Sequence, residues 1–134
     1  MGTRSTIALE FADGTVEQVY CHWDGYLAHN GRILQSHYMD PFEVKALVSL
    51  GGFSSLKQTF GETADEAYTQ HGEELSINKY KDIIEYMRDG QQEEYDYILR
   101  NVNGVATWFV RCYATDSTWV TLEEAVKLAK EYTE

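Results

Sequence analysis

The sequence predicts an α+β fold in a single domain over residues 1–134. A chain of 134 residues is long enough to bury a core without disulfides or a metal ion. Two pairs of strand-like segments flank an Asp-Gly and an Asn-Gly turn, which is the signature of β-hairpins. Capped segments with apolar residues at helical spacing lie between and after the hairpins. Because an isolated hairpin is marginally stable, we expect both to join one antiparallel sheet packed with about four helices.

The first hairpin is predicted to have strands at residues 5–11 and 16–23, joined by a two-residue turn at Asp13-Gly14. In the register that this turn sets, Tyr20 and His22 face the apolar side of the sheet. A bulge in the turn would shift the register by one residue and would turn both side chains to the other face.

Helices are predicted from N-capping residues that precede apolar residues at helical spacing. They are expected at residues 25–39, 41–50, 77–89 and from 122 onward, with Asp24, Asp40, Ser76 and Thr121 as their respective N-caps. Gly51 and Gly90 are placed where the second and third helices end. Residues 52–75 are predicted to form a long exposed loop with a helical turn near residues 64–68.

The second hairpin is predicted at residues 95–113, with Asn103-Gly104 at its tip. The register of this turn pairs Asp96 with Arg111. Large apolar side chains occur on both faces of these strands, so we expect the hairpin to lie centrally in the sheet and to be covered on both sides.

The charge of the chain limits its partners. The sequence has 22 acidic and 11 basic residues, which gives a net charge of −11. Binding to nucleic acid or to an anionic membrane requires Lys and Arg, so we expect neither as a direct partner. A protein with a basic surface is the expected partner, although the acidity can also serve solubility alone. The sequence has no membrane-spanning run, no secretory signal and no lipidation motif, and we expect a cytoplasmic protein.

The segment Tyr20-Cys21-His22-Trp23-Asp24-Gly25-Tyr26, here called the heptapeptide, concentrates reactive and aromatic side chains where a strand ends. We predict a polar, aromatic-rimmed binding patch made of Arg4, Tyr20, His22, Trp23, Asp24 and Tyr26. A second candidate binding surface is the acidic loop, whose carboxylates belong to Glu62, Asp65, Glu66, Glu73 and Glu74. The sequence does not decide which of the two is the working surface.

No catalytic set, metal site or cofactor is predicted. Cys21 and His22 are adjacent in a strand, so their side chains point to opposite faces and cannot share one zinc ion. His29 and His37 lie eight residues apart, which is also a poor spacing for one ion. We interpret Cys21 as a structural residue, because acidic surroundings raise the pKa of a thiol and make it a weaker nucleophile at neutral pH.

The segments Met1-Gly2-Thr3-Arg4-Ser5 and Tyr20–Tyr26, followed by Gly31, Leu34 and Tyr38, resemble a group of small uncharacterised proteins from bacteriophages and prophages. The resemblance covers the first third of the chain. It implies action inside an infected bacterium and transfers no catalytic role. We therefore expect a non-enzymatic protein that binds and modulates a host protein as an anti-defence or host-takeover inhibitor. Mimicry of the charge of nucleic acid is one route to this effect.

Two other functions remain open from the sequence. A small-molecule or nucleotide-binding protein, such as a sponge for a signalling nucleotide, would use Arg4, His22, Trp23 and Asp24. A small hydrolase or transferase would use His22 and Asp24 for acid–base chemistry. In the ordinary interpretation His22 ends a strand and Asp24 caps a helix. The oligomeric state is left open.

Overall fold

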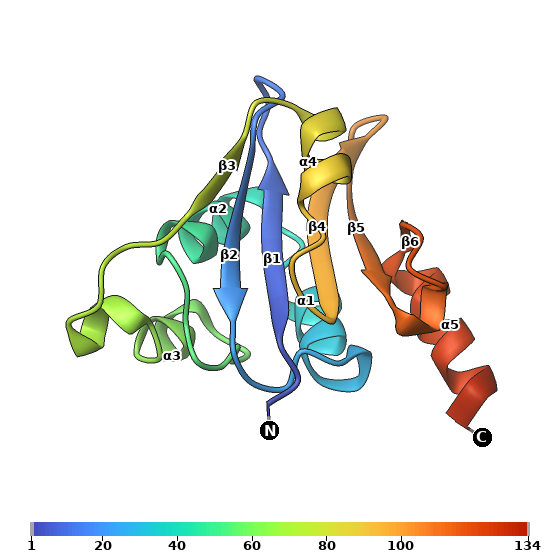
Figure 1. Cartoon of the computed structure of the whole chain (residues 1–134), viewed down its shortest axis with the longest axis horizontal. Coiled ribbons are helices and arrows are strands. Elements are labelled where there is room, and N and C mark those ends of the chain that lie inside the picture. Colours follow the sequence, from blue (N-terminus) through green and yellow to red (C-terminus); the bar gives the residue numbers. More distant parts are fainter. Residues whose placement is uncertain (1, 134) are drawn as a thin grey trace.

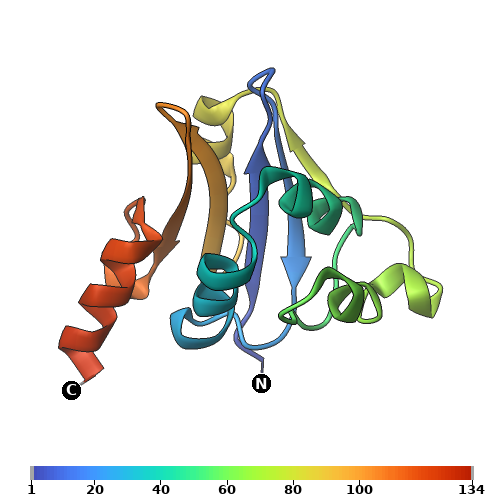
Figure 2. The same ribbon diagram turned by 180° about the vertical axis from the view of Figure 1, so that it is seen from behind.

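The computed structural model describes residues 2–133, with side chains to residue 129, and confirms the α+β class. In this part of the chain, six strands form one sheet in the order β3-β2-β1-β4-β5-β6. Helix α4 covers one face of the sheet (Figure 1), and α1 and α2 cover the other (Figure 2). The strands are β1 (Ser5–Glu10), β2 (Val16–Cys21), β3 (Asn78–Tyr80), β4 (Tyr95–Val102), β5 (Val105–Cys112) and β6 (Val120–Thr121).

The helices are shorter than predicted, and turns of other types connect them. The α-helices are α1 (Arg32–His37), α2 (Pro41–Ser49), α3 (Phe60–Ala64), α4 (Ile83–Asp89) and α5 (Leu122–Thr133). A π-helical turn, η1 (Leu27–Gly31), precedes α1, and two 3₁₀ turns are η2 (Tyr68–His71) and η3 (Tyr113–Thr115). No helix of the described residues has both the length and the apolar character needed to cross a membrane.

The sheet is mixed, so the prediction of a wholly antiparallel sheet is wrong at one pairing. The two hairpins meet through their first strands, β1 and β4, which run parallel with Ser5 opposite Tyr95 and Leu9 opposite Leu99. A parallel pairing needs a long crossover connection. Here residues 11–94 connect the two strands, and they contain α1 and α2 on one face and α4 on the other.

The register of the first hairpin differs from the prediction by one residue. The amide of Gly14 donates to the carbonyl oxygen of Phe11 at 2.9 Å, and the amide of Phe11 donates to the carbonyl oxygen of Thr15 at 2.8 Å. The loop therefore has three residues and not two, and Gly14 takes a left-handed φ of +92° that suits a glycine bulge. The Asp13 carboxylate stabilises this loop by accepting from the Thr15 amide at 3.0 Å.

This shift reverses the predicted faces of β2. Thr6 lies opposite Tyr20, and Ser5 lies opposite Cys21. The described residues form two apolar cores, a larger one on the face that α1 and α2 cover and a smaller one on the face that α4 covers. Cys21 is consequently buried in the larger core, whereas Tyr20 faces the side of the sheet that carries α4. The prediction that Tyr20 and His22 face the larger apolar side is wrong, because the bulge adds one residue to the turn.

The second hairpin is confirmed in its strands and register. β4 and β5 pair with Asp96 opposite Arg111 and Leu99 opposite Trp108. Leu99 belongs to the larger core under α1, α2 and α5, while the neighbouring Ile98 belongs to the smaller core under α4. The hairpin is therefore covered on both faces, as predicted.

Two of the predicted caps are confirmed. The Asp40 carboxylate accepts from the Phe42 amide at 2.9 Å and begins α2. The Thr121 hydroxyl accepts from the Glu124 amide at 3.2 Å and begins α5. Both lie where a capping side chain directly precedes apolar residues at helical spacing, so the local signal agrees with the tertiary packing.

The helix predicted from Ser76 is wrong in its first half. Residues Asn78–Tyr80 form the edge strand β3, which pairs with β2 from Val16 to Gln18. The α4 helix begins later, and its cap is the Asp82 carboxylate, which accepts from the Glu85 amide at 2.8 Å. Pairing with the exposed edge of β2 satisfies backbone groups that a longer helix would leave unpaired, which overrides the helical pattern.

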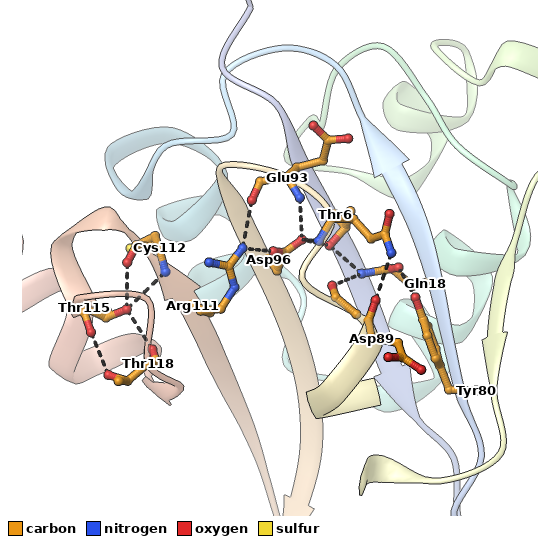
Figure 3. A network of polar contacts seen from close by, with 12 residues as sticks. Thr6, Gln18, Tyr80, Asp89, Glu93, Asp96, Arg111, Cys112, Thr115 and Thr118 are labelled. Carbon is orange, nitrogen blue, oxygen red and sulfur yellow. Dashed lines mark hydrogen bonds and ion pairs between the residues drawn. The ribbon is translucent and has the colours of Figure 1, made fainter. Parts of the chain in front are cut away.

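A buried polar network lies between the sheet and the end of α4 (Figure 3). The Asp96 carboxylate accepts from the Arg111 guanidinium and from the Thr6 hydroxyl. The Gln18 amide nitrogen donates to the Thr6 hydroxyl and to the Gly90 carbonyl oxygen, both at 2.9 Å. The network joins four strands to the helix end and satisfies polar groups that water cannot reach.

Candidate functional site

The heptapeptide turns away from the end of β2 against a second segment of the chain. The His22 amide donates to the Phe53 carbonyl oxygen at 3.3 Å, and the Trp23 amide donates to the Ser54 carbonyl oxygen at 2.8 Å. Phe53 is fully buried and also forms an isolated parallel bridge with Cys21. Residues that follow α2 therefore extend the sheet beside the heptapeptide and hold its backbone in place.

Asp24 and Gly25 form the turn itself. Asp24 has a left-handed φ of +56°, and its carbonyl oxygen accepts from the Asn30 amide at 3.3 Å. The predicted role of Asp24 as a side-chain cap is wrong, because the chain enters a π-helical turn at Leu27 and no side chain caps it. A Cβ at Gly25 would lie 2.7 Å from the Cβ of Ser5, so this position requires glycine.

Four rings gather beside this turn and form what we call the aromatic patch: Tyr20, His22, Trp23 and Tyr68. The Tyr20 hydroxyl and His22 Nδ1 share a hydrogen bond of 2.7 Å. His22 packs edge to face with Trp23 at 4.6 Å between ring centroids, and Tyr20 stacks on Tyr68 at 6.4 Å. The Trp23 side chain remains 43% exposed, so the patch presents a large aromatic surface to solvent.

Two charged residues act electrostatically on the aromatic patch. Burial raises the pKa of the Glu93 carboxyl, and the positive charge of Arg4 opposes this shift. Burial raises the pKa of Tyr20, and the positive charge of Arg4 offsets part of this rise. Burial likewise raises the pKa of Tyr68 to about 12, so both phenols are neutral at physiological pH. The patch therefore offers neutral hydrogen-bonding hydroxyls beside one cation and one carboxyl group.

The structure brings together only part of the predicted binding patch. Arg4, Tyr20, His22 and Trp23 lie within contact or electrostatic reach of one another. Tyr26 lies apart, where its ring packs against His29 at 6.1 Å and lines a hollow near α5. Because Tyr20 occupies one ring nitrogen of His22, a paired acid–base role for His22 and Asp24 gains no support from the hydrogen bonds of the described residues.

Tyr68 and Glu93 belong to the site but were not predicted from the sequence. Tyr68 reaches Tyr20 because Phe53 bridges both Cys21 and Ala67. Glu93 lies two residues before β4, and it reaches the patch because β4 pairs in parallel with β1. Only knowledge of this parallel pairing would have placed Glu93 in the site, and no local sequence pattern predicts the pairing.

Cys21 is a poor nucleophile in this structure. Its side chain is fully buried, and burial raises the pKa of the thiol to about 11. The Asn30 amide nitrogen donates to its sulfur at 3.5 Å. A thiol that stays protonated and excluded from solvent fits the structural role predicted for it.

The acidic loop packs directly against the aromatic patch. The Ser54 amide donates to the Glu66 carbonyl oxygen at 2.9 Å, and the Glu73 amide donates to the Tyr68 carbonyl oxygen at 3.2 Å. Of the predicted acidic residues, Glu62, Asp65, Glu73 and Glu74 are exposed and Glu66 is half-buried, and the charge of Glu73 acts on Tyr68. The helical turn predicted at residues 64–68 is misplaced, since Thr59 caps α3 and the 3₁₀ turn η2 follows it.

Among the residues that the structure describes, no group of three or more His, Cys, Asp or Glu side chains is arranged to hold a metal ion. Comparisons of the chain with models of protein families, with curated proteins and with solved structures found no match. The chemistry of the site is therefore argued from its own residues.

Proposed function

We propose that this protein is a non-enzymatic binding protein that attaches to a host protein in the bacterial cytoplasm and modulates it. The observation that carries the proposal is the stacking of Tyr20 on Tyr68, which joins the two surfaces proposed from the sequence. In this proposal the aromatic patch and the carboxylates of residues 62–74 act together as one binding surface, here called the aromatic–acidic face. The reactive side chains of the heptapeptide have structural partners, which favours binding over catalysis.

The aromatic–acidic face has the composition of a protein-binding surface. Interfaces concentrate binding energy in Trp and Tyr side chains near the centre and place charged groups at the rim. Here exposed Trp23 is the expected anchor, and the neighbouring carboxylates would attract a basic partner over a distance. The resemblance to phage proteins supplies the host context, and a groove that normally holds nucleic acid is the proposed target.

The first test is affinity capture of the tagged protein from bacterial lysate after nuclease treatment. We expect one host protein at stoichiometric yield with the wild type, and a loss of affinity of roughly thirtyfold with Trp23→Ala, because a hot-spot residue contributes at least about 2 kcal/mol. Val105→Ala is the control, since Val105 is 63% exposed at the tip of the second hairpin, at the end of the sheet opposite the heptapeptide. Equal capture by Trp23→Ala and the wild type would contradict the proposal.

The second test separates charge from shape. Neutralising Glu73 and Glu74 to Gln is expected to slow association and to reduce its dependence on salt. The control neutralises Glu123 and Glu124 on α5, which removes the same charge from a different element. Binding that is unchanged from low to high salt would count against charge mimicry, even if the Trp23 result held.

A further inference from the structure

A hollow of about 820 Å³ lies between η1, the start of α1, the η3 segment and α5. This volume falls in the range of pockets that hold small organic molecules, roughly 300–1,000 Å³. Of the heptapeptide, only Tyr26 lines it, and none of the residues of the aromatic–acidic face does. The hollow is therefore a surface that the proposed function does not use.

The walls of the hollow are apolar and aromatic. The aliphatic part comes from Leu27 and Ala28 on η1 and from Val126 on α5. Tyr95 is half-buried and stacks on Tyr97 at 6.4 Å with 12° between the rings, which holds its ring in a fixed orientation. Tyr113 stands 92% exposed at the rim, where its ring is accessible to a ligand. Flat aromatic walls of this kind favour a ligand with a planar ring.

Two opposite charges line the same hollow from different segments. Arg32 begins α1, and Asp116 follows η3. Among the side chains that the structure describes, neither forms a hydrogen bond or ion pair with another residue. A guanidinium presents two parallel N–H groups that match a carboxylate. The net charge of −11 disfavours a ligand with several negative charges.

The loop that carries Asp116 is held in an unusual conformation. Asp116 and Ser117 both take left-handed φ values, of 53° and 60°. The Ser117 amide donates to the Cys112 carbonyl oxygen at 3.0 Å, and the Thr115 hydroxyl donates to the Thr118 carbonyl oxygen at 2.7 Å. Two successive non-glycine residues in this region cost free energy that the surrounding bonds must offset, as happens at preorganised sites.

From these features we infer that the hollow binds a small aromatic monocarboxylate. The ring lies against the tyrosine walls, the carboxylate accepts from Arg32, and Asp116 accepts from an N–H group where the ligand has one. This site goes beyond the proposed function and shares no residue with the aromatic–acidic face.

The test uses indole-3-acetate as the probe, with calorimetry for affinity and amide chemical shifts for location. We expect saturable binding that shifts the amides of Ala28 and Ala114. Affinity should fall at least about tenfold for the uncharged indole-3-ethanol and for Arg32→Gln, since each removes the charged hydrogen bond. Arg88→Gln is the matched control, because Arg88 is exposed on α4 and pairs with Asp89. Cyclohexylacetate, which keeps the carboxylate without the aromatic ring, should also bind more weakly.

Three outcomes would overturn the inference. They are the absence of saturable binding at millimolar concentration, equal affinity of Arg32→Gln and the wild type, and sedimentation as a dimer with the hollow covered by a second copy. Host-protein capture distinguishes this failure from that of the proposed function. Arg32→Gln should leave capture unchanged, and Trp23→Ala should leave binding of indole-3-acetate unchanged.

Discussion

The hydroxyl of Tyr97 donates a hydrogen bond of 2.6 Å to the carbonyl oxygen of Gly25 and so anchors the heptapeptide to strand β4. The amide of Gly25 donates in turn to the Thr3 carbonyl oxygen at 2.8 Å, on the segment that leads into β1. These two hydrogen bonds fix the turn at Asp24 and Gly25 to β4 and to the segment that leads into β1. The two hydrogen bonds of Gly25 therefore help to position the neighbouring aromatic patch.

Tyr97→Phe is expected to destabilise the protein by about 1–2 kcal/mol, because it leaves the buried carbonyl oxygen of Gly25 without a donor. Urea unfolding followed by circular dichroism measures the change. Tyr113→Phe is the control, since its exposed ring has no hydroxyl partner among the described residues. Equal stability of the two variants would show that the Tyr97 bond does not hold the turn.

Breaking the buried pair of Asp96 and Arg111 is expected to be more costly. Arg111→Met removes the guanidinium and leaves a fully buried carboxylate, at a cost of about 3–5 kcal/mol. The comparison is Arg100→Met, which removes a more exposed pair with Glu10 and should cost about 1 kcal/mol or less. Thermal unfolding of both variants decides the order, and a smaller loss for Arg111→Met would contradict this account.

Removing the hydroxyl of Tyr86 is expected to stabilise the protein, in contrast to the two substitutions above. Its ring is fully buried against Tyr80 and Trp119, and the hydroxyl is buried without a hydrogen-bond partner among the described residues. Tyr86→Phe is therefore expected to raise the free energy of unfolding by about 1 kcal/mol, since it removes an unsatisfied polar group and keeps the ring. A loss of stability in this variant would indicate that the neighbouring Gln18 side chain or an ordered water satisfies the hydroxyl.

Stability is expected to fall in alkaline solution. Burial raises the pKa of Cys21 to about 11, from 9.0 for an ordinary thiol, and raises the pKa of Tyr97 well above the 10.0 of an ordinary phenol. The folded state thus favours the neutral forms, and the stability they contribute is complete below the pKa values of the unfolded chain. That stability is lost as the pH rises through about 9 to 11. Melting temperatures measured across this range test it, and a constant value to pH 11 would refute it.

The two hairpins show where the sequence suffices and where it does not. The register of the hairpin at Asn103-Gly104 is predicted to the residue, because an Asn-Gly pair fits a two-residue turn and both faces of the hairpin are apolar. The hairpin at Asp13-Gly14 is displaced by one residue, because an Asp-Gly pair also fits a three-residue loop with glycine in the left-handed position. The length of this loop sets which side chains of β2 lie on each face of the sheet. The three-residue loop, closed by the hydrogen bond from Gly14 to Phe11, places Tyr20 on the face that carries α4.

The candidate site is likewise predicted in part from local sequence and in part not. Arg4, Tyr20 and His22 are near one another by virtue of the hairpin alone, and the sequence predicts their proximity. Tyr68 and Glu93 come from segments that tertiary pairing alone brings in. Their positions depend on the bridge at Phe53 and on the parallel pairing of β1 with β4, which have no local sequence signal.

The parallel pairing of β1 with β4 has a consequence for how the chain acquires its site. Thr6 and Asp96 bond to each other across 90 positions of sequence, so the centre of the sheet closes a very long loop. Local hairpins form quickly, whereas contacts of this separation slow folding. During synthesis, the first strands leave the ribosome long before their partner does. The surface that contains Glu93 and the aromatic patch therefore cannot form until most of the chain has been made.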